Sequence, residues 1–182
     1  MPLPNTKERY SYQDYITWDD DERWEIIDGV AYNMAPAPKL DHQDVTGNFY
    51  TFLNVHLKGK RCKPFIAPTD VILSEHDVVQ PDVLVVCDPK KYENGKNIQG
   101  APNLVIEVLS PSTENKDRTV KKAQCAKFGV AEYLIADIDK QIVEQYVLQP
   151  DGNYNYIAGY EPDQSIPLQS LEGIYIPLTE IF

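Results

Sequence analysis

The stretch GAPNLVIEVLSPST at residues 100–113, continued by KDRTVKKAQCAKFGVAEYLIAD at 116–137, decides how this chain is expected to fold. Its nearly continuous apolar run at 103–109 predicts a strand that is covered on both faces. A helix is predicted from about 114 to 128, because Gly129 then provides a typical helix end. The letters EYLIAD at 132–137 predict a further strand.

The first part of the chain predicts a short helix and a hairpin. Ser11 followed by Asp14 is the pattern of a capping box, which indicates a helix through about Trp18. The run WEIIDGVAYNM at 24–34 is apolar on both sides of Asp28-Gly29, a dipeptide that favours the tight turn of a hairpin. Two antiparallel strands are therefore expected here.

The next elements are a long helix and several short strands. We expect the prolines at 36 and 38 to break the sheet, and Asp41 to cap a helix that Gly59 ends. Strand-like runs follow at Pro64–Ala67, Asp70–Leu73 and Val78–Cys87, and at 141–148 and 153–160, where a half-exposed hairpin is expected. This order predicts an α/β fold, a mixed sheet flanked by helices with an additional N-terminal hairpin and C-terminal strands. Because no linker or repeat divides it, one domain over 1–182 is expected.

Composition limits the class of protein. The 182 residues are 42% hydrophobic and 25% charged, values that are typical of a globular domain. The longest apolar stretch, Val83–Cys87, is too short to span a membrane, and the start shows no signal peptide, so we expect a cytoplasmic protein. Cys62, Cys87 and Cys125 stand far apart without a C-x-x-C pair, which argues against both a disulfide framework and a zinc cluster.

The net charge of -11 argues against avid, non-specific binding to nucleic acid, but the charge is unevenly distributed. Residues 58–127 carry 12 basic and 9 acidic side chains, whereas 1–57 carry 4 and 10, and 128–182 carry 1 and 9. The central segment is therefore either an ordinary solvated surface or a face for an anionic ligand.

Two carboxylates stand next to apolar strand residues in this central segment. Asp82 follows Pro81 and opens the run VLVV, and Glu107 interrupts the run at 103–109. A buried carboxylate is normally paired, protonated or bound to a metal, and oxygen donors suit Mg²⁺ or Mn²⁺. The alternative is that Glu107 points to solvent or meets an arginine.

These residues carry a resemblance to the Uma-type family of restriction endonucleases, long catalogued as a domain of unknown function and placed in the PD-(D/E)XK nuclease superfamily. The segments that carry it are RWEIIDGVAYNMAPAPKLDHQDVTGNFYTFL (23–53), APTDVILSEHDVVQPDVLVV (67–86) and the two stretches quoted first, so that it covers roughly residues 11–150. Since several motifs match in order, the resemblance is specific. It implies a restriction-endonuclease-like core.

The resemblance also implies a catalytic set. Pro81-Asp82 matches the PD element, and Glu107 begins the E-x-K element, where Leu109 stands in place of the lysine. In this family the lysine resembles one that has moved to the following helix, which offers Lys121 and Lys122. We favour Lys121, because at 100° per residue it shares a stripe with Asp117 and Cys125 that becomes apolar and should face the protein.

The implied activity is hydrolysis of DNA phosphodiester bonds by an endonuclease that depends on Mg²⁺ or Mn²⁺. Asp82, Glu107 and the backbone carbonyl of Val108 would hold the metal, and Lys121 would orient the attacking water. The acidic net charge favours an alternative, a catalytically silent nuclease-fold protein that serves as a binding module or scaffold. A weaker alternative is a carboxylate-pair hydrolase that acts on sugars.

Other residues are secondary candidates for the site or for binding. Glu25 matches an E-x-x-DG element of the family but is about as easily structural, and His42 is more often a cap or a packed residue than a catalyst. A basic patch after the long helix either steers a phosphate backbone or complements the helix dipole; it consists of Lys58, Lys60, Arg61 and Lys63.

The C-terminal third predicts an assembly surface. Apolar or aromatic residues alternate with polar ones at 141–148 and 153–160, and Lys140 is the sole basic residue after 127. Aromatic residues with few lysines are typical of an interface core, so we expect a homodimer, although the hairpin could instead cover only its own sheet.

Overall fold

The computed structural model describes residues 9–18, 22–34 and 39–182. A six-stranded sheet forms its centre, in the order β11-β10-β9-β8-β6-β3. Its strands β8 and β9 run parallel and the other neighbours antiparallel, so the sheet is mixed as expected. The strands are β3 (Lys63–Ile66), β6 (Val83–Val86), β8 (Leu104–Val108), β9 (Glu132–Asp137), β10 (Ile142–Leu148) and β11 (Tyr154–Tyr160).

A smaller five-stranded sheet lies beside it, in the order β2-β1-β5-β4-β7. The hairpin of β1 and β2 turns at Asp28-Gly29, where φ is 50° for Asp28 and 78° for Gly29. Glycine adopts positive φ without strain, and aspartate adopts it more readily than most other residues. The predicted N-terminal hairpin is therefore confirmed. The strands of this sheet are β1 (Trp24–Ile27), β2 (Val30–Asn33), β4 (Val71–Ser74), β5 (Asp77–Val79) and β7 (Ile98–Gln99).

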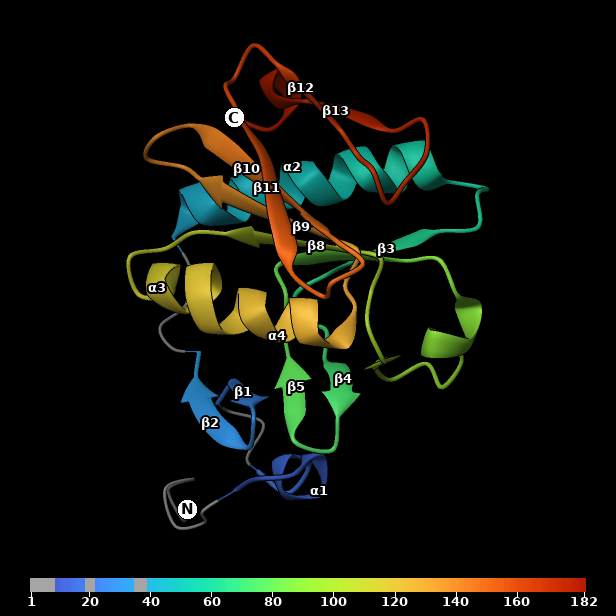
Figure 1. Cartoon of the computed structure of the whole chain (residues 1–182), viewed down its shortest axis with the longest axis vertical. Helices are drawn as coiled ribbons and strands as arrows, with labels where there is room; N and C mark the ends of the chain where they lie inside the picture. The colour runs from blue at the N-terminus through green and yellow to red at the C-terminus, as the bar shows by residue number, and fades with distance from the viewer. Residues whose placement is uncertain (1–8, 19–21, 35–38) are drawn as a thin grey trace.

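Helices cover both faces of the central sheet. Figure 1 shows α2 (Leu40–Leu57) above it, and α3 (Glu114–Lys116) and α4 (Lys122–Phe128) below it. A π-helical turn, Asp117–Lys121, joins α3 to α4, so the helix predicted over 114–128 is one segment with a widened middle. Gly129 ends it in the left-handed conformation, as predicted.

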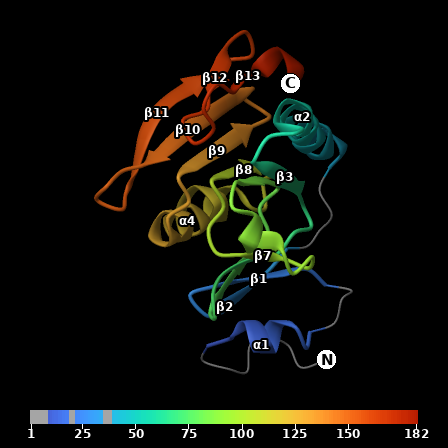
Figure 2. The ribbon, with the colours of Figure 1, turned by 90° about the vertical axis from the view of Figure 1, so that its right-hand side faces the viewer.

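The two faces of the central sheet bury separate apolar clusters. Phe49 and Leu53 of α2 pack on Leu104 and Ile106, which face up from β8. Val105 faces down, where it packs with Cys125 of α4 and with strands of the smaller sheet. The side view in Figure 2 shows α2 and α4 on opposite sides of the central strands, with β1 and β2 farther down.

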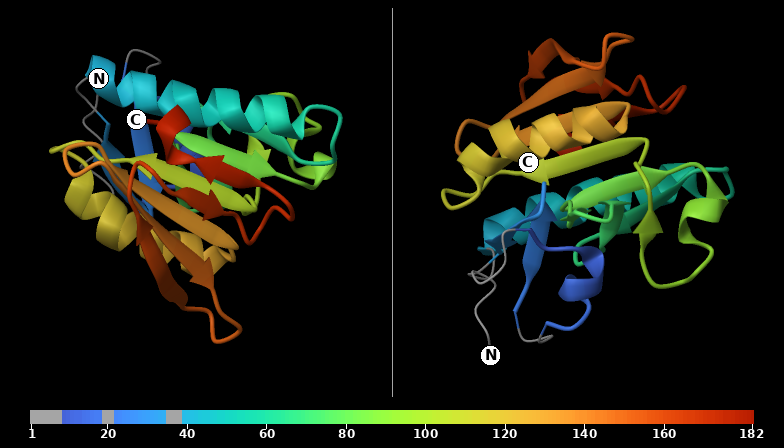
Figure 3. Two further views of the ribbon diagram at one scale, coloured as in Figure 1. Left: turned by 90° about the horizontal axis from the view of Figure 1, so that it is seen from above. Right: turned by 60° about the horizontal axis from the view of Figure 1, so that its bottom comes forward.

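The C-terminal segment returns to α2. Strands β12 (Ser165–Pro167) and β13 (Tyr175–Pro177) pair with each other, and a 3₁₀ turn follows at Leu178–Glu180. The view from above in Figure 3 shows this segment beside α2. The side-chain amide of Asn48 in α2 donates to the carbonyl of Ile181 at 3.0 Å, which ties the segment to the helix.

Several predicted elements are confirmed with altered bounds. The capping box of Ser11 and Asp14 is present, although the helix it opens, α1, extends only over Tyr12–Tyr15. The long helix begins at Leu40 with Lys39 as its N-cap, so Asp41 lies in its first turn and is not the cap. The prolines at 36 and 38 lie outside the described residues.

The single strand expected over Val78–Cys87 was wrong. The structure has two strands there, β5 and β6, in different sheets. Pro81 lacks an amide hydrogen, and the amide of Gln80 donates to the Glu25 carboxylate at 2.8 Å, so neither residue continues a ladder. The break places Asp82 at a strand end.

The expectation of unpaired cysteines was also wrong for two of the three. Cys62 and Cys87 form a disulfide, and Cys125 is free and buried. Cys62 immediately precedes β3 and Cys87 immediately follows β6, and these strands pair Lys63 with Val86. Strand pairing thus brings together two residues 25 positions apart. The described helices include none that is long and apolar enough to cross a membrane. The cytoplasmic location and the single domain stay predictions.

Candidate functional site

Asp82 and Glu107 lie side by side on neighbouring strands. Antiparallel β6 and β8 pair Val83 with Ile106, so the next position of this register places Asp82 beside Glu107. The amide of Val108 donates to Asp82 Oδ2 at 2.9 Å, which fixes one face of that carboxylate. The side chain of Glu107 is 2% exposed and that of Asp82 is 20% exposed. The pair therefore has one buried and one accessible carboxylate.

Lys121 joins this pair from the π-helical turn. Its Nζ lies 2.8 Å from Glu107 Oε1 and 2.8 Å from Glu25 Oε1, and it donates to the carbonyl of Gln80 at 3.3 Å. An ammonium group has three hydrogens to donate, and three oxygens lie near it here, although Glu107 Oε1 is an ion-pair partner without a hydrogen bond of good geometry. Lys121 therefore links both sheets to the helix.

The charged groups around Lys121 form one cluster, which consists of Glu25, Asp82, Glu107, Asp117 and Lys116. Within this cluster, Glu25 is the carboxylate whose charge is most strongly balanced by cations. It is fully buried at the start of β1, and Lys116 Nζ lies 2.6 Å from its Oε2. The amide of Gln80 donates to its other oxygen at 2.8 Å. Burial alone would raise the pKa of Glu25, but the charges of Lys121 and Lys116 lower it to about 2. Glu25 is therefore ionised and fixed in place.

Glu107 has much weaker compensation. Its Oε1 is buried and accepts no hydrogen bond of good geometry, although Lys121 pairs with it. Burial raises the pKa of Glu107 well above its ordinary value; Lys121 opposes the rise, and the charges of Asp117 and Asp82 add to it. For Lys121 the effect of burial, which would lower its pKa, is exceeded by the attraction of the carboxylates, so its pKa is well above 10.5. The cluster therefore has more carboxylates than cations.

His42 lies against the accessible carboxylate. Its Nε2 is 3.4 Å from Asp82 Oδ2, and its Nδ1 is 3.4 Å from the hydroxyl of Thr46, one turn along α2. Burial would lower the pKa of His42, but the hydrogen bond and charge of Asp82 raise it above 6.5. The backbone of Val108 also contacts this ring. The structure thus places His42, which was predicted only as a secondary candidate, beside Asp82 in the wall of a pocket.

A pocket of about 510 Å³ opens at Asp82. Asp82 and His42 form part of its wall, and the turn from Leu109 to Glu114 and the start of the loop after β9 form other parts. The other lining residues are Arg23 directly before β1, Met34 directly after β2, and Lys39 and Asp41 at the start of α2. A substrate in this pocket can therefore contact Asp82 directly, whereas Glu107 is not part of the pocket wall.

The second candidate lysine and part of the basic patch lie elsewhere. Lys122 Nζ sits 4.0 Å from the centre of the Tyr146 ring, away from the carboxylates. Arg61 donates to the carbonyl of Cys87. Lys63 Nζ lies over the rings of Phe65 and Tyr92. These cations therefore belong to surfaces outside the Asp82 pocket.

Two residues in or beside this cluster were missed by the sequence analysis. Lys116 is one, although the family-like stretch 116–137 begins with it. The other is Gln80, whose position directly before Pro81-Asp82 was a usable signal. Its side-chain carbonyl accepts two hydrogen bonds from Arg23, at 3.0 and 2.9 Å, so it connects the buried cluster to a residue of the pocket wall.

The donor set fits a hard divalent cation. Among the described residues no three His, Cys, Asp or Glu side chains surround one point, so an ion would be held by Asp82, Glu107, the Val108 carbonyl and water. Mg²⁺ commonly keeps several waters and takes only one or two carboxylates. Burial raises the pKa of Glu107, and the neighbouring carboxylates of Asp117 and Asp82 add to the rise; a bound cation would offset both effects.

Comparison with known proteins places these features in a family. The model of the Uma2 family, described as "Putative restriction endonuclease", matches residues 12–179. The chain is 30% identical over 169 residues to the uncharacterized protein slr1290 of Synechocystis, covering 90% of this chain and 86% of that one. It is 28% identical over 135 residues to the uncharacterized protein sll1609 of the same organism, covering 69% and 72%.

A solved structure has the same fold. It is a crystal structure from Anabaena variabilis, described as a "putative nuclease belonging to DUF820". The TM-score is 0.76 at 21% sequence identity, covering 94% of this chain and 97% of that chain. The expected α/β, nuclease-like fold is confirmed by this match.

Proposed function

The chain belongs to the Uma2 family, and we propose on that basis that it is an endonuclease that hydrolyses DNA phosphodiester bonds with Mg²⁺ or Mn²⁺. The observation that supports this most directly is the buried, under-compensated Glu107 beside the accessible Asp82 at a pocket wall. A carboxylate buried in this way costs stability unless cations balance it, and Lys121, the one cation that pairs with Glu107 among the described residues, is shared with Glu25.

Each residue has a defined part in the proposal. Asp82, Glu107 and the carbonyl of Val108 would hold the ion, which when bound activates a water and neutralises charge on the phosphate. His42 keeps Asp82 oriented through its Nε2 contact. Lys121 keeps Glu107 oriented, and it contacts an attacking water only if it exchanges one of its three present acceptors for that water.

The test is cleavage of supercoiled plasmid and of single-stranded DNA with Mg²⁺ and with Mn²⁺. We expect cleavage by the wild type to fall by on the order of 100-fold in Asp82→Asn, Glu107→Gln and Lys121→Met. Lys122→Met is the matched control, because the neighbouring lysine lies on Tyr146, and it should cut like the wild type. No cleavage by the wild type on any of these substrates would contradict the proposal.

A catalytically silent binding protein is the second candidate. The three oxygens around the Lys121 ammonium favour it, because a water would have to displace one of them to reach this group. Calorimetry with Mn²⁺ separates the two. Saturable binding that Asp82→Ala abolishes supports the enzyme, and its absence supports the silent protein.

We also propose a homodimer that uses the C-terminal tyrosines. Tyr156 is 53% exposed on β11, which is an edge strand of the central sheet. Tyr146 packs against it with ring centres 5.5 Å apart, so the two rings form one aromatic surface. Light scattering should give twice the 20.7 kDa chain mass at micromolar concentration, and Tyr156→Lys should halve it. A single-chain mass for the wild type would contradict the dimer.

A further inference from the structure

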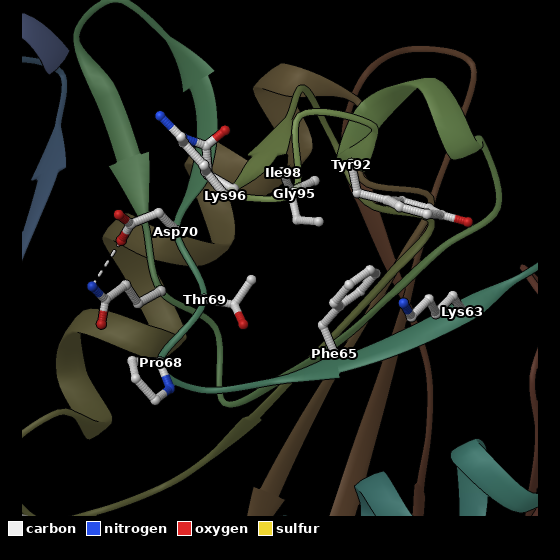
Figure 4. A pocket seen from close by; sticks show the side chains of 11 residues that line it. Lys63, Phe65, Pro68, Thr69, Asp70, Tyr92, Gly95, Lys96 and Ile98 are labelled. Carbon is white, nitrogen blue, oxygen red and sulfur yellow. Dashed lines mark hydrogen bonds between the residues drawn. The ribbon is translucent and has the colours of Figure 1, made fainter.

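A second pocket, of about 380 Å³, lies on the other side of Gln80 from the Asp82 pocket. Phe65 of β3 and Tyr92 of the 3₁₀ turn at Pro89–Tyr92 pack with ring centres 5.3 Å apart. Figure 4 shows these rings and Lys63 on one side of the pocket, with Pro68 and Asp70 on the other. Both rings are only half buried, so part of their surface is open to a ligand.

Two lysines line this pocket. Lys63 and Lys96 are exposed, and neither forms an ion pair with any carboxylate of the described residues. Lys63 Nζ lies 5.1 Å from the centre of the Phe65 ring and 5.5 Å from that of Tyr92. Positive charge beside an open aromatic face suits a ligand that has both a flat ring and a phosphate.

Polar groups complete the wall opposite the rings. The Asp70 carboxylate accepts from Gln80 Nε2 and from the Tyr15 hydroxyl, both at 2.8 Å and both through Oδ1. These bonds fix the carboxylate at the pocket wall, where it can accept from the edge of a base. The wall is therefore rigid and polar, which suits recognition of a base more than packing of an apolar ligand.

Gln80 connects this pocket to the proposed active site. Its side chain lines the second pocket and accepts a hydrogen bond from Arg23, which lines the Asp82 pocket. Its backbone carbonyl accepts a hydrogen bond from Lys121. Gln80 and Asp82 are two residues apart, so their Cα atoms are at most about 7 Å apart. One nucleic-acid strand is long enough to contact both pockets.

We propose that this second pocket binds a nucleotide of the DNA strand being cut, with its base on the rings of Phe65 and Tyr92 and its phosphate near Lys63 and Lys96. The inference rests on the proposed nuclease function and specifies its substrate. A base within a duplex cannot enter a side pocket without leaving its stack, so the pocket selects single-stranded or locally opened DNA.

The test is binding of a fluorescein-labelled oligothymidylate and of a duplex of equal length, measured by anisotropy in EDTA so that no strand is cut. We expect the single strand to bind more tightly than the duplex. Tyr92→Leu and Lys63→Gln should each weaken binding of the single strand by about tenfold and change binding of the duplex by less than about twofold.

Matched controls separate the pocket from general charge and aromatic content. Lys127 Nζ lies 5.1 Å from the centre of the Phe128 ring, the same geometry as Lys63 over Phe65, but on α4. Lys127→Gln and Tyr175→Leu, the latter at a tyrosine that is 63% exposed on β13, should leave binding of the single strand unchanged. The proposal is overturned if Lys63→Gln and Lys127→Gln weaken binding equally, or if the duplex binds as tightly as the single strand.

Cleavage distinguishes this inference from the function on which it rests. If Tyr92→Leu loses binding of the single strand and the wild type cuts no DNA with metal, the pocket stands and the nuclease proposal fails. If the wild type cuts DNA and Tyr92→Leu binds and cuts like the wild type, the nuclease proposal stands and the pocket inference fails.

Discussion

Glu107 and Glu132 are two buried glutamates on adjacent parallel strands, and their surroundings differ in kind. Glu132, at the start of β9, is fully buried, and its two oxygens accept from neutral groups: the Gln145 amide, the backbone of Gln169, and the backbone and hydroxyl of Ser170. These bonds attach the C-terminal segment to the sheet. Glu107 lies on the opposite face, where Lys121 is its ion-pair partner and its Oε1 accepts no hydrogen bond of good geometry.

The difference shows that burial alone does not identify a functional carboxylate. A buried carboxylate with several neutral donors is a structural hydrogen-bond acceptor, because the donors replace the water it has lost. One that depends on a shared lysine and faces further carboxylates is instead suited to a cation. The comparison therefore assigns Glu132 to stability and Glu107 to the proposed metal site, and three measurements test that division.

The largest expected effect comes from removing the shared cation. Lys121→Met leaves Glu25 and Glu107 buried without it, and breaking a buried pair in this way costs about 3–5 kcal/mol. Urea unfolding in EDTA measures the loss. Lys122→Met should lower the free energy of unfolding by less than about 1 kcal/mol, since its lysine loses only the contact with Tyr146. Equal losses in the two variants would contradict the conclusion that the buried Glu25 and Glu107 depend on Lys121 for their stability.

The second effect is the response to metal. Mn²⁺ at 100 times its dissociation constant should stabilise the wild type by about 2.7 kcal/mol, because the ion binds only the folded state. Glu107→Gln should lose this gain, whereas Glu132→Gln should keep it whatever its own stability in EDTA. Thermal unfolding of each variant with and without Mn²⁺ gives the comparison. A gain that persists in Glu107→Gln would show that the ion binds elsewhere.

The central part of this site was predictable from the sequence, and its surroundings were not. Asp82, Glu107 and Lys121 follow from motif order and from an α-helical stripe, and the structure brings all three together; that they bind metal or catalyse stays a prediction. Lys116 was not predictable from that stripe, since residues five apart in an α-helix are separated by about 140° around its axis. The π-helical turn brings residues five apart nearly into line, so Lys116 and Lys121 meet the same glutamate.

The fold shows the same limit. Local signals gave the hairpin turn at Asp28-Gly29, the helix end at Gly129 and most strands. They did not give the assignment of strands to two sheets, because that depends on long-range pairing such as Ile26 with Val78. The disulfide between Cys62 and Cys87 was missed for the same reason, since it follows from the pairing of β3 with β6.

The smallest effect concerns Asp117, which is buried beside the cluster at the start of the π-helical turn. Burial raises its pKa from 3.8 to about 6, and the charge of Lys121 opposes the rise. A carboxyl whose pKa is higher in the folded state contributes stability that is fully present below pH 3.8 and is lost as the pH rises through about 6. Above that pH, the ionised carboxylate is a cost to the fold.

Asp117→Asn removes that cost and should therefore raise the free energy of unfolding by about 1–2 kcal/mol at pH 8; the roughly 3 kcal/mol of a two-unit shift, which already includes the attraction to Lys121, is the upper bound. The gain should shrink as the pH falls from 6 toward 4. Chemical unfolding across this range, with exposed Asp163→Asn as the control, measures the difference. If Asp117→Asn is less stable than the wild type at pH 8, Asp117 resembles Glu132, and its ionised form is held by its neighbours as a structural acceptor.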